Sequence, residues 1–147
     1  MCFFFVVYYF YYLFLFYLAL MFNLIRSLID GMRERSFGRI INISSISRSG
    51  NMGQSNYSVA KAGVQAMSVV WAKELARYGI RSASIAPGFI STDLVMSMKP
   101  EALEKMTRPI PAKRLGEPDE IAHTVQFILE NDYVNGRCIE VDGALRL

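Results

Sequence analysis

Charge, glycine and proline are all absent from the first 25 residues of this 147-residue chain, where the first charge is Arg26 and the first glycine is Gly31. Residues 3–17 consist only of Phe, Tyr, Val and Leu. An uncharged run of about 20 residues is long enough to span a bilayer, and basic residues after such a run favour a cytoplasmic downstream part. Residues 1–21 are therefore a candidate membrane anchor that would leave residues 22–147 in the cytoplasm.

The composition of this run also fits a second interpretation. Tyrosine prefers membrane interfaces to the hydrocarbon centre, and the run has neither a basic start nor a cleavage site of small residues. A secretory signal peptide is therefore not expected. The alternative to an anchor is a non-native, low-complexity segment over residues 1–21, joined to a soluble domain over residues 22–147.

Cysteine and histidine are too scarce to build a disulfide framework or a metal site. The two cysteines, Cys2 and Cys138, lack CxxC or Cys/His spacing, and His123 is the only histidine. We expect no metal, and a reducing cytoplasm as the location. The net charge is only +3 and no basic stretch alternates with aromatic residues, so a nucleic-acid partner is not expected.

From residue 22 onward the periodicity becomes that of an α/β protein. Apolar residues at helical spacing predict helices over residues 22–35, 57–78 and 116–129. Short apolar runs predict strands over residues 39–44, 81–86 and 137–141. Between them, residues 89–115 read as a mobile excursion with a short helix near residues 101–106. Helices that alternate with short strands indicate a single parallel sheet covered on both faces.

Tyr57 and Lys61 stand four residues apart in a predicted helix, so both side chains emerge on one face near its amino-terminal end. An unperturbed phenol has a pKa near ~10, and a neighbouring ammonium would lower this pKa toward the range useful for proton transfer. The pair therefore suits acid catalysis. The same spacing also occurs on any solvated helix face, which is the open alternative.

Other candidate residues lie where two predicted strands end. Ser44 and Ser45 stand at the carboxyl end of the first strand, and Pro87-Gly88 follows the second. Ligands of parallel α/β sheets bind at this edge. A plain strand end and an ordinary turn are the alternatives.

Five motifs stand in order along the chain: GRIINISS (38–45), NYSVAKAG (56–63), IAPGFISTD (85–93), GEPDEIA (116–122) and NGRCIEVDG (135–143). Through them, residues 22–147 resemble the short-chain dehydrogenase/reductase family, most of all its 3-oxoacyl-acyl-carrier-protein reductase branch. The resemblance implies an oxidoreductase that uses NADP or NAD to reduce a small carbonyl or acyl thioester substrate, as in fatty acid biosynthesis. It also implies a homo-oligomer.

The resemblance assigns catalytic roles to three residues. Tyr57 would protonate the carbonyl oxygen as hydride arrives. Ser45, with Ser44 as the alternate, would donate a hydrogen bond to that oxygen. Lys61 would lower the pKa of the phenol, and both Tyr57 and Lys61 would contact the cofactor, whose ribose Lys61 holds.

The resemblance also places the nicotinamide at the end of the second strand. Pro87 and Gly88 would shape the turn there, Ile90 would offer its backbone to the nicotinamide amide, and Thr92 would contact the same group. A helix N-cap is the alternative role for Thr92.

The family's Gly-rich phosphate loop has no counterpart in this sequence. In the family its glycines let the backbone approach the cofactor pyrophosphate at a helix amino terminus. We therefore predict the carboxyl-terminal portion of a Rossmann-like doubly wound parallel sheet, with the amino-terminal half missing and one edge of the strand at 39–44 unpaired. The position at which relatives carry a proton-relaying asparagine falls at Tyr17.

Two functions from different classes follow. The first is an oxidoreductase-family chain that is inactive alone and needs the missing half from another chain. The second is a non-enzymatic, truncated remnant that acts as an assembly module or a membrane-anchored interaction module.

Overall fold

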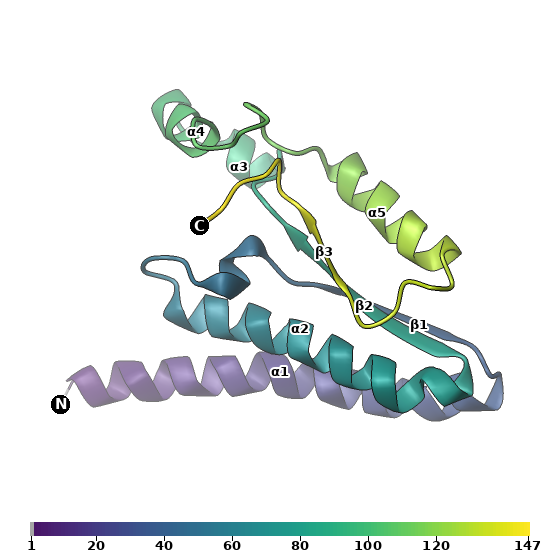
Figure 1. The fold of residues 1–147 in the computed structure, drawn as a ribbon. Helices are drawn as coiled ribbons and strands as arrows, with labels where there is room; N and C mark the ends of the chain where they lie inside the picture. Colours follow the sequence, from purple (N-terminus) through teal and green to yellow (C-terminus); the bar gives the residue numbers. More distant parts are fainter. Residues whose placement is uncertain (1) are drawn as a thin grey trace.

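The computed structural model describes the backbone of residues 2–147 and the side chains of residues 17–147. In chain order the elements are α1 (Cys2–Glu34), β1 (Gly38–Ile43), the 3₁₀ turn η1 (Ile46–Ser49), α2 (Ser55–Leu75), the 3₁₀ turn η2 (Ala76–Tyr78), β2 (Ile80–Pro87), α3 (Asp93–Met96), α4 (Pro100–Thr107), α5 (Pro118–Glu130) and β3 (Cys138–Val141). Figure 1 traces them from the long amino-terminal helix to the last strand.

The three strands form one parallel sheet in the order β1-β2-β3. Gly38 of β1 pairs with Ile80 of β2, and Ser84 of β2 pairs with Cys138 of β3. No strand in the described part of the chain pairs with the outer edge of β1. The predicted α/β fold with a parallel sheet is confirmed, and β1 lies at an edge as expected.

Helices cover both faces of the sheet. Helix α2 packs on β1 and β2 with α1 beside it, while α5 lies on the opposite face (Figure 1). Alternation along the strands produces the two cores, because successive side chains of a strand point to opposite faces. Ile40 and Ile80 pack under the α1–α2 layer with Trp71 and Leu75. The α5 face is filled by other residues: Ile41, Ala83, Ile85, Val125, Ile128, Val134, Ile139 and Val141.

The turn from α2 into β2 depends on a glycine. Gly79 has φ of 69°, and a Cβ on it would lie 2.2 Å from the carbonyl oxygen of Ser36. Only glycine avoids both the left-handed strain and this clash. The predicted helix over 57–78 therefore ends here, although its last three residues form the 3₁₀ turn η2.

The excursion between β2 and α5 contains more helix than the sequence indicated. The expected short helix is α4, while α3 is a four-residue helix that the apolar pattern did not reveal. Ile46, Ile110 and Leu145 form a third buried cluster that fastens this segment beneath the carboxyl end of the chain.

Helix α1 runs without a break across residues 21 and 22, where the sequence suggested a change from an apolar segment to a domain. Among the residues searched, no helix is long and apolar enough to cross a membrane. Most of the candidate anchor, residues 1–16, lies outside the residues whose side chains are described.

A buried polar link joins β1 to α2. The Asn42 side-chain amide donates to the Ser68 hydroxyl at 2.8 Å, and that hydroxyl donates to the Val64 carbonyl at 3.0 Å. Ser68 is only 1% exposed and Asn42 only 7%. This link fixes the position of α2 along its axis relative to β1. It therefore also positions the amino-terminal turns of that helix.

Removing the Ser68 hydroxyl tests the link. We expect Ser68→Ala to lower the free energy of unfolding by about 1–3 kcal/mol, since the buried Asn42 amide loses its acceptor. Urea unfolding measures this as a lower midpoint at unchanged slope. Ser49→Ala, at an exposed position, should leave the midpoint unchanged, and equal midpoints for the two variants would contradict the role given to Ser68.

Candidate functional site

The two serines after β1 have different environments. The Ser44 amide continues the strand ladder by donating to the Ile85 carbonyl at 2.7 Å, and its hydroxyl donates to the Lys61 carbonyl at 2.8 Å. The Ser45 hydroxyl oxygen instead accepts from the Ser47 amide at 3.1 Å and so caps η1. The Ser44 hydroxyl thus donates its proton in a hydrogen bond to the backbone of α2. The Ser45 hydroxyl proton, in contrast, has no acceptor among the described groups.

Tyr57 and Lys61 lie in the first two turns of α2, beside the end of β1. The Lys61 Nζ donates to the Ile43 carbonyl at 2.9 Å and lies 5.6 Å from the centroid of the Tyr57 ring. Tyr57 is 42% exposed, so part of its side chain is accessible from solvent. The structure therefore brings the predicted pair together, with the ammonium within reach of the ring by a cation–π contact.

The electrostatics of Lys61 follow from its place. Burial removes water from the ammonium and so lowers the pKa of Lys61 below its ordinary value of 10.5. An ammonium has three N–H donors, and the Ile43 carbonyl takes one. The remaining donors are available to oxygen atoms of a ligand.

The end of β2 approaches the turn after β3 very closely. Pro87 pairs with Val141 in the last register position, and the Gly88 amide donates to the Val141 carbonyl at 2.9 Å. A Cβ on Gly88 would lie 2.8 Å from the Cα of Asp142, so no other residue fits without a shift of the backbone. The Pro87-Gly88 turn is thus set by backbone packing at the carboxyl edge of the sheet.

Ile90 and Thr92 follow on the same edge. Ile90 forms an isolated parallel bridge with Gly116, and its carbonyl accepts from the Thr92 amide at 2.8 Å. The Ile90 amide has no backbone partner among the described residues. The Thr92 hydroxyl oxygen accepts from the Val95 amide at 3.4 Å and caps α3, which is the alternative role noted from the sequence. As an acceptor in that cap, the hydroxyl still has a proton to donate.

Arg48 is a site residue that sequence reasoning missed. Its side chain donates to the Ser45 carbonyl at 3.2 Å and forms an ion pair with Glu140 of β3, which Arg146 also contacts at 3.2 Å. The pair ties the Ser45 loop to the far edge of the sheet. Its partners lie 92 residues apart, so no local sequence pattern could reveal it. In the described part of the chain, no three His, Cys, Asp or Glu side chains gather as a metal site would require.

Comparison with known proteins gives a consistent result. A family model described as "Enoyl-(Acyl carrier protein) reductase" matches residues 17–145. An acetoacetyl-CoA reductase of Synechocystis sp. is 47% identical over 124 residues, which covers 82% of this chain and 52% of the relative. The acetoacetyl-CoA reductase of Cupriavidus necator is 38% identical over 133 residues, covering 88% of this chain and 54% of the relative. The chain thus spans about half the length of the curated relatives it matches.

Solved structures agree with this result. The 3-hydroxyacyl-CoA dehydrogenase type-2 from Mycobacterium avium has a TM-score of 0.86 and 36% identity, with 94% of this chain and 57% of that chain covered. A 3-oxoacyl-[acyl-carrier protein] reductase from Brucella melitensis has a TM-score of 0.80 and 32% identity, with 86% and 48% covered.

The lowered pKa of Lys61 predicts a particular dependence of stability on pH. Between the folded pKa and the ordinary value of 10.5, the unfolded chain holds a proton on Lys61 that the folded chain has released. Unfolding then takes up a proton, so this group makes the free energy of unfolding rise as pH increases through that window. The measurement is the free energy of unfolding in urea from neutral pH to about 10.5. It should contain this rise for the unchanged chain and lack it for Lys61→Met. Lys73→Met, on the exposed side of the same helix, should retain it, and a rise that persists in Lys61→Met would contradict the assignment.

Proposed function

This chain belongs to the short-chain dehydrogenase/reductase family, and we propose that it supplies the catalytic half of an NADP- or NAD-dependent reductase of 3-oxoacyl thioesters or similar carbonyl compounds. The names of its relatives support the substrate class, since acetoacetyl-CoA is itself a 3-oxoacyl thioester. The reaction is the reduction of the ketone to a secondary alcohol, in which a hydride adds to the carbonyl carbon and a proton to its oxygen.

One observation carries this proposal. Two hydrogen bonds, from Ser44 to the Lys61 carbonyl and from Lys61 to the Ile43 carbonyl, fasten the start of α2 to the end of β1. They hold Lys61, whose Nζ lies 5.6 Å from the centroid of the Tyr57 ring, at the carboxyl end of β1, which Ser45 follows in the chain. A proton donor, a hydrogen-bond donor and a cation are thus gathered where parallel sheets bind ligands.

Each of these groups has a chemical task. Tyr57 donates its hydroxyl proton to the carbonyl oxygen, and Ser45 donates a hydrogen bond to the same oxygen as negative charge develops on it. The Lys61 ammonium stabilises the phenolate that Tyr57 becomes after it gives up its proton. The partly buried setting strengthens this attraction, because fewer water molecules screen the charges.

The residues present fit the nicotinamide end of the cofactor, which supplies the hydride when bound. The free donors of Lys61 suit the ribose hydroxyls, and the Ile90 amide and the Thr92 hydroxyl suit the carboxamide. Gly88 acts indirectly, because its close packing on Asp142 fixes the turn that leads to Ile90. The pyrophosphate of the cofactor is bound in this family by a glycine-rich turn that precedes a helix. This sequence has no such turn, since its first glycine, Gly31, lies within α1. We therefore propose that residues outside these 147 bind the pyrophosphate and that the chain is inactive alone.

The second candidate function is an assembly module without catalysis. It is favoured by the apolar side chains that α1 exposes, among them Leu20 at 50%, Leu24 at 59% and Leu28 at 47% exposure. A helix face of this kind buries well against another helix pair, and a homo-oligomer formed through it is compatible with either function.

A measurement of cofactor binding shows whether the chain alone is a complete reductase or, as both candidate functions require, is not. We expect the full chain to show no saturable NADPH or NADH binding at concentrations that saturate an intact acetoacetyl-CoA reductase, because half a dinucleotide site holds the ligand weakly. Fluorescence titration of the reduced cofactor measures this. Tight binding by the chain alone would contradict the proposed need for other residues.

A chimera tests the catalytic residues. Residues 38–147, joined to the amino-terminal half of an active acetoacetyl-CoA reductase, should oxidise NADPH in the presence of acetoacetyl-CoA. Tyr57→Phe in the chimera should lower kcat by roughly 10²–10⁴-fold while cofactor affinity changes little, because the lost proton acts in the transition state. Tyr133→Phe, at a residue that is 99% exposed, is the matched control.

The outcomes separate the two candidate functions. A chimera that folds and binds NADPH yet turns over as fast without the Tyr57 hydroxyl would assign the proton to another group. A chimera that folds and binds NADPH without any turnover would favour the assembly module.

A further inference from the structure

Arg48 contacts the backbone of the candidate catalytic serine in two ways. The Ser45 carbonyl accepts from the Arg48 amide at 3.1 Å, which closes the 3₁₀ turn η1, and from the Arg48 guanidinium Nη1 at 3.2 Å. The hydroxyl oxygen of the same serine accepts from the Ser47 amide at 3.1 Å. Hydrogen bonds of a 3₁₀ turn have poorer geometry than those of an α-helix. The guanidinium therefore adds a constraint that the turn alone lacks.

The far end of the Arg48 side chain begins a row of alternating charges. Its Nη2 forms an ion pair with Glu140, Glu140 forms a second pair with Arg146 at 3.2 Å, and Arg146 pairs with Asp142 at 2.7 Å. We call these four residues the charged row. Two cations alternate with two anions, so each charge has a neighbour of opposite sign. The end members, Arg48 and Asp142, have side chains only 11% and 7% exposed, so salt and water screen them less than surface charges.

The charged row ends at the turn after β2. An added Cβ on Gly88 would lie 2.8 Å from the Cα of Asp142, and the Asp142 Oδ1 accepts from the Ala144 amide at 2.9 Å. Gly88 stands two residues before Ile90. The row therefore connects the loop that contains Ser45 with the turn that leads to Ile90, along one edge of the sheet.

An apolar contact joins the same two parts of the chain. Ile46 follows Ser45 directly, Leu145 precedes Arg146 directly, and both belong to one buried cluster with exposures of 7% and 3%. Apolar packing is non-directional, so it holds the two segments together without fixing their orientation. Hydrogen bonds to a planar guanidinium are directional, and the charged row supplies them.

We propose that Arg48 is a positioning residue for the Ser45 hydroxyl. It fixes the Ser45 backbone, and through the charged row it fixes the distance from Ser45 to the turn at Gly88. A carbonyl whose oxygen binds Ser45 is aligned with the residues after Gly88 only while this distance stays constant. A misplacement of about 1 Å in such an alignment can slow a reaction ~10²-fold. This inference rests on the proposed reductase function.

Hydrogen exchange in the full chain tests the hold on Ser45 without any catalysis. We expect Arg48→Met to speed exchange of the Ser47 amide about tenfold, because the turn opens more often. The Ser84 amide, which donates to the Arg137 carbonyl at 2.9 Å, should keep its rate. NMR measures both rates. Equal acceleration at the two amides would show a general loss of stability, and an unchanged Ser47 rate would show no hold on the turn, so either result would overturn the proposal.

A second variant separates the contact with Ser45 from the ion pair. Arg48→Met and Glu140→Gln both remove the ion pair, but only Arg48→Met removes the guanidinium bond to the Ser45 carbonyl. Exchange of the Ser47 amide should therefore rise more in Arg48→Met than in Glu140→Gln. Equal rises would assign the whole effect to the ion pair and contradict the proposed contact.

The chimera of residues 38–147 tests the catalytic consequence. Arg48→Met should lower kcat by roughly 10–100-fold while KM for NADPH changes little, because Ser45 acts on charge that develops in the transition state. In a Ser45→Ala background, Arg48→Met should cost nothing further, since a positioning residue has no effect once the group it positions is gone. A loss of the same size in both backgrounds would overturn the proposal.

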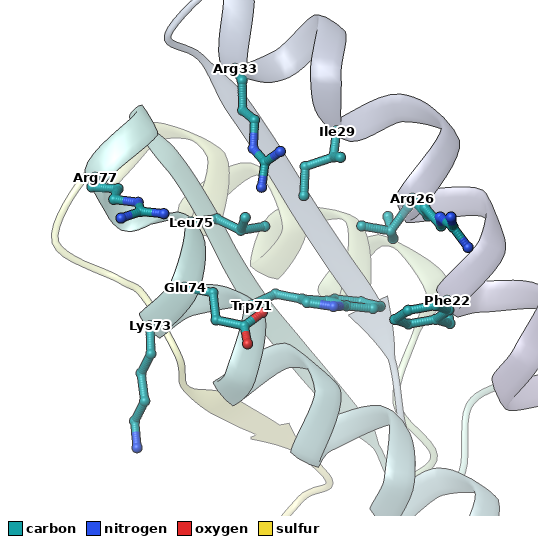
Figure 2. A pocket seen from close by; sticks show the side chains of 10 residues that line it. Phe22, Arg26, Ile29, Arg33, Trp71, Lys73, Glu74, Leu75 and Arg77 are labelled. Carbon is teal, nitrogen blue, oxygen red and sulfur yellow. The ribbon is translucent and has the colours of Figure 1, made fainter.

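Arg77→Met is the matched control. Arg77 stands 20 residues after Tyr57 along α2 and η2, about 30 Å by helical rise, and Figure 2 shows its side chain extending toward Leu75. This variant should leave kcat and the Ser47 exchange rate unchanged, and losses equal to those of Arg48→Met would contradict the inference.

Failure of the inference differs from failure of the proposed function. A chimera that loses rate with Tyr57→Phe but keeps it with Arg48→Met would contradict only the role of Arg48. A chimera without turnover would contradict the proposed function, and with it the catalytic role of Arg48, whereas hydrogen exchange would still decide whether Arg48 holds Ser45.

Discussion

The candidate catalytic edge of this protein depends on a reciprocal pair of hydrogen bonds between the end of β1 and the second turn of α2. Ser44 donates to the Lys61 carbonyl, and the Lys61 ammonium donates to the Ile43 carbonyl. Each bond joins a side chain of one element to the backbone of the other, so sliding or rotation of α2 would break at least one. The buried bond from Asn42 to Ser68, two turns further along the helix, acts in the same direction. The position of the Tyr57 ring, one turn before Lys61, follows from these contacts rather than from bonds of its own.

One lateral edge of the sheet, that of β1, is free to pair with a further strand. β1 lies at the side of a three-stranded parallel sheet, and its outer backbone groups pair with no strand in the described part of the chain. Strand edges of this kind accept a further strand readily, because the unpaired N–H and C=O groups form a template. A complementary half that pairs with β1 would also bring its own groups to the carboxyl edge where Ser45 and Ile90 lie. Under the proposed function, strand pairing and completion of the cofactor site are therefore expected to occur together.

Helix α2 carries two regions of different character. Its amino-terminal turns present Tyr57 and Lys61 to the sheet edge, whereas its last turns and η2 present Trp71 and Arg77 to α1. The first region has a single cation that is partly buried and hydrogen-bonded to the backbone. The second has several cations around an apolar floor.

Sequence periodicity alone determined the fold class, the three strands and the long helices. Apolar residues recur about every 3.6 residues in a helix and every second residue in a strand, so their spacing distinguishes the two. The Tyr57–Lys61 pair was also readable, since four-residue spacing in a helix places side chains on one face. Tertiary structure decided what local patterns cannot express. It assigned the Ser44 hydroxyl to α2 and left the Ser45 hydroxyl without an acceptor among the described groups, it joined Arg48 to Glu140, and it placed Arg33 over the ring of Tyr78. Those contacts join residues 17, 92 and 45 positions apart in the sequence, and only the packing of helices on the sheet brings such residues together.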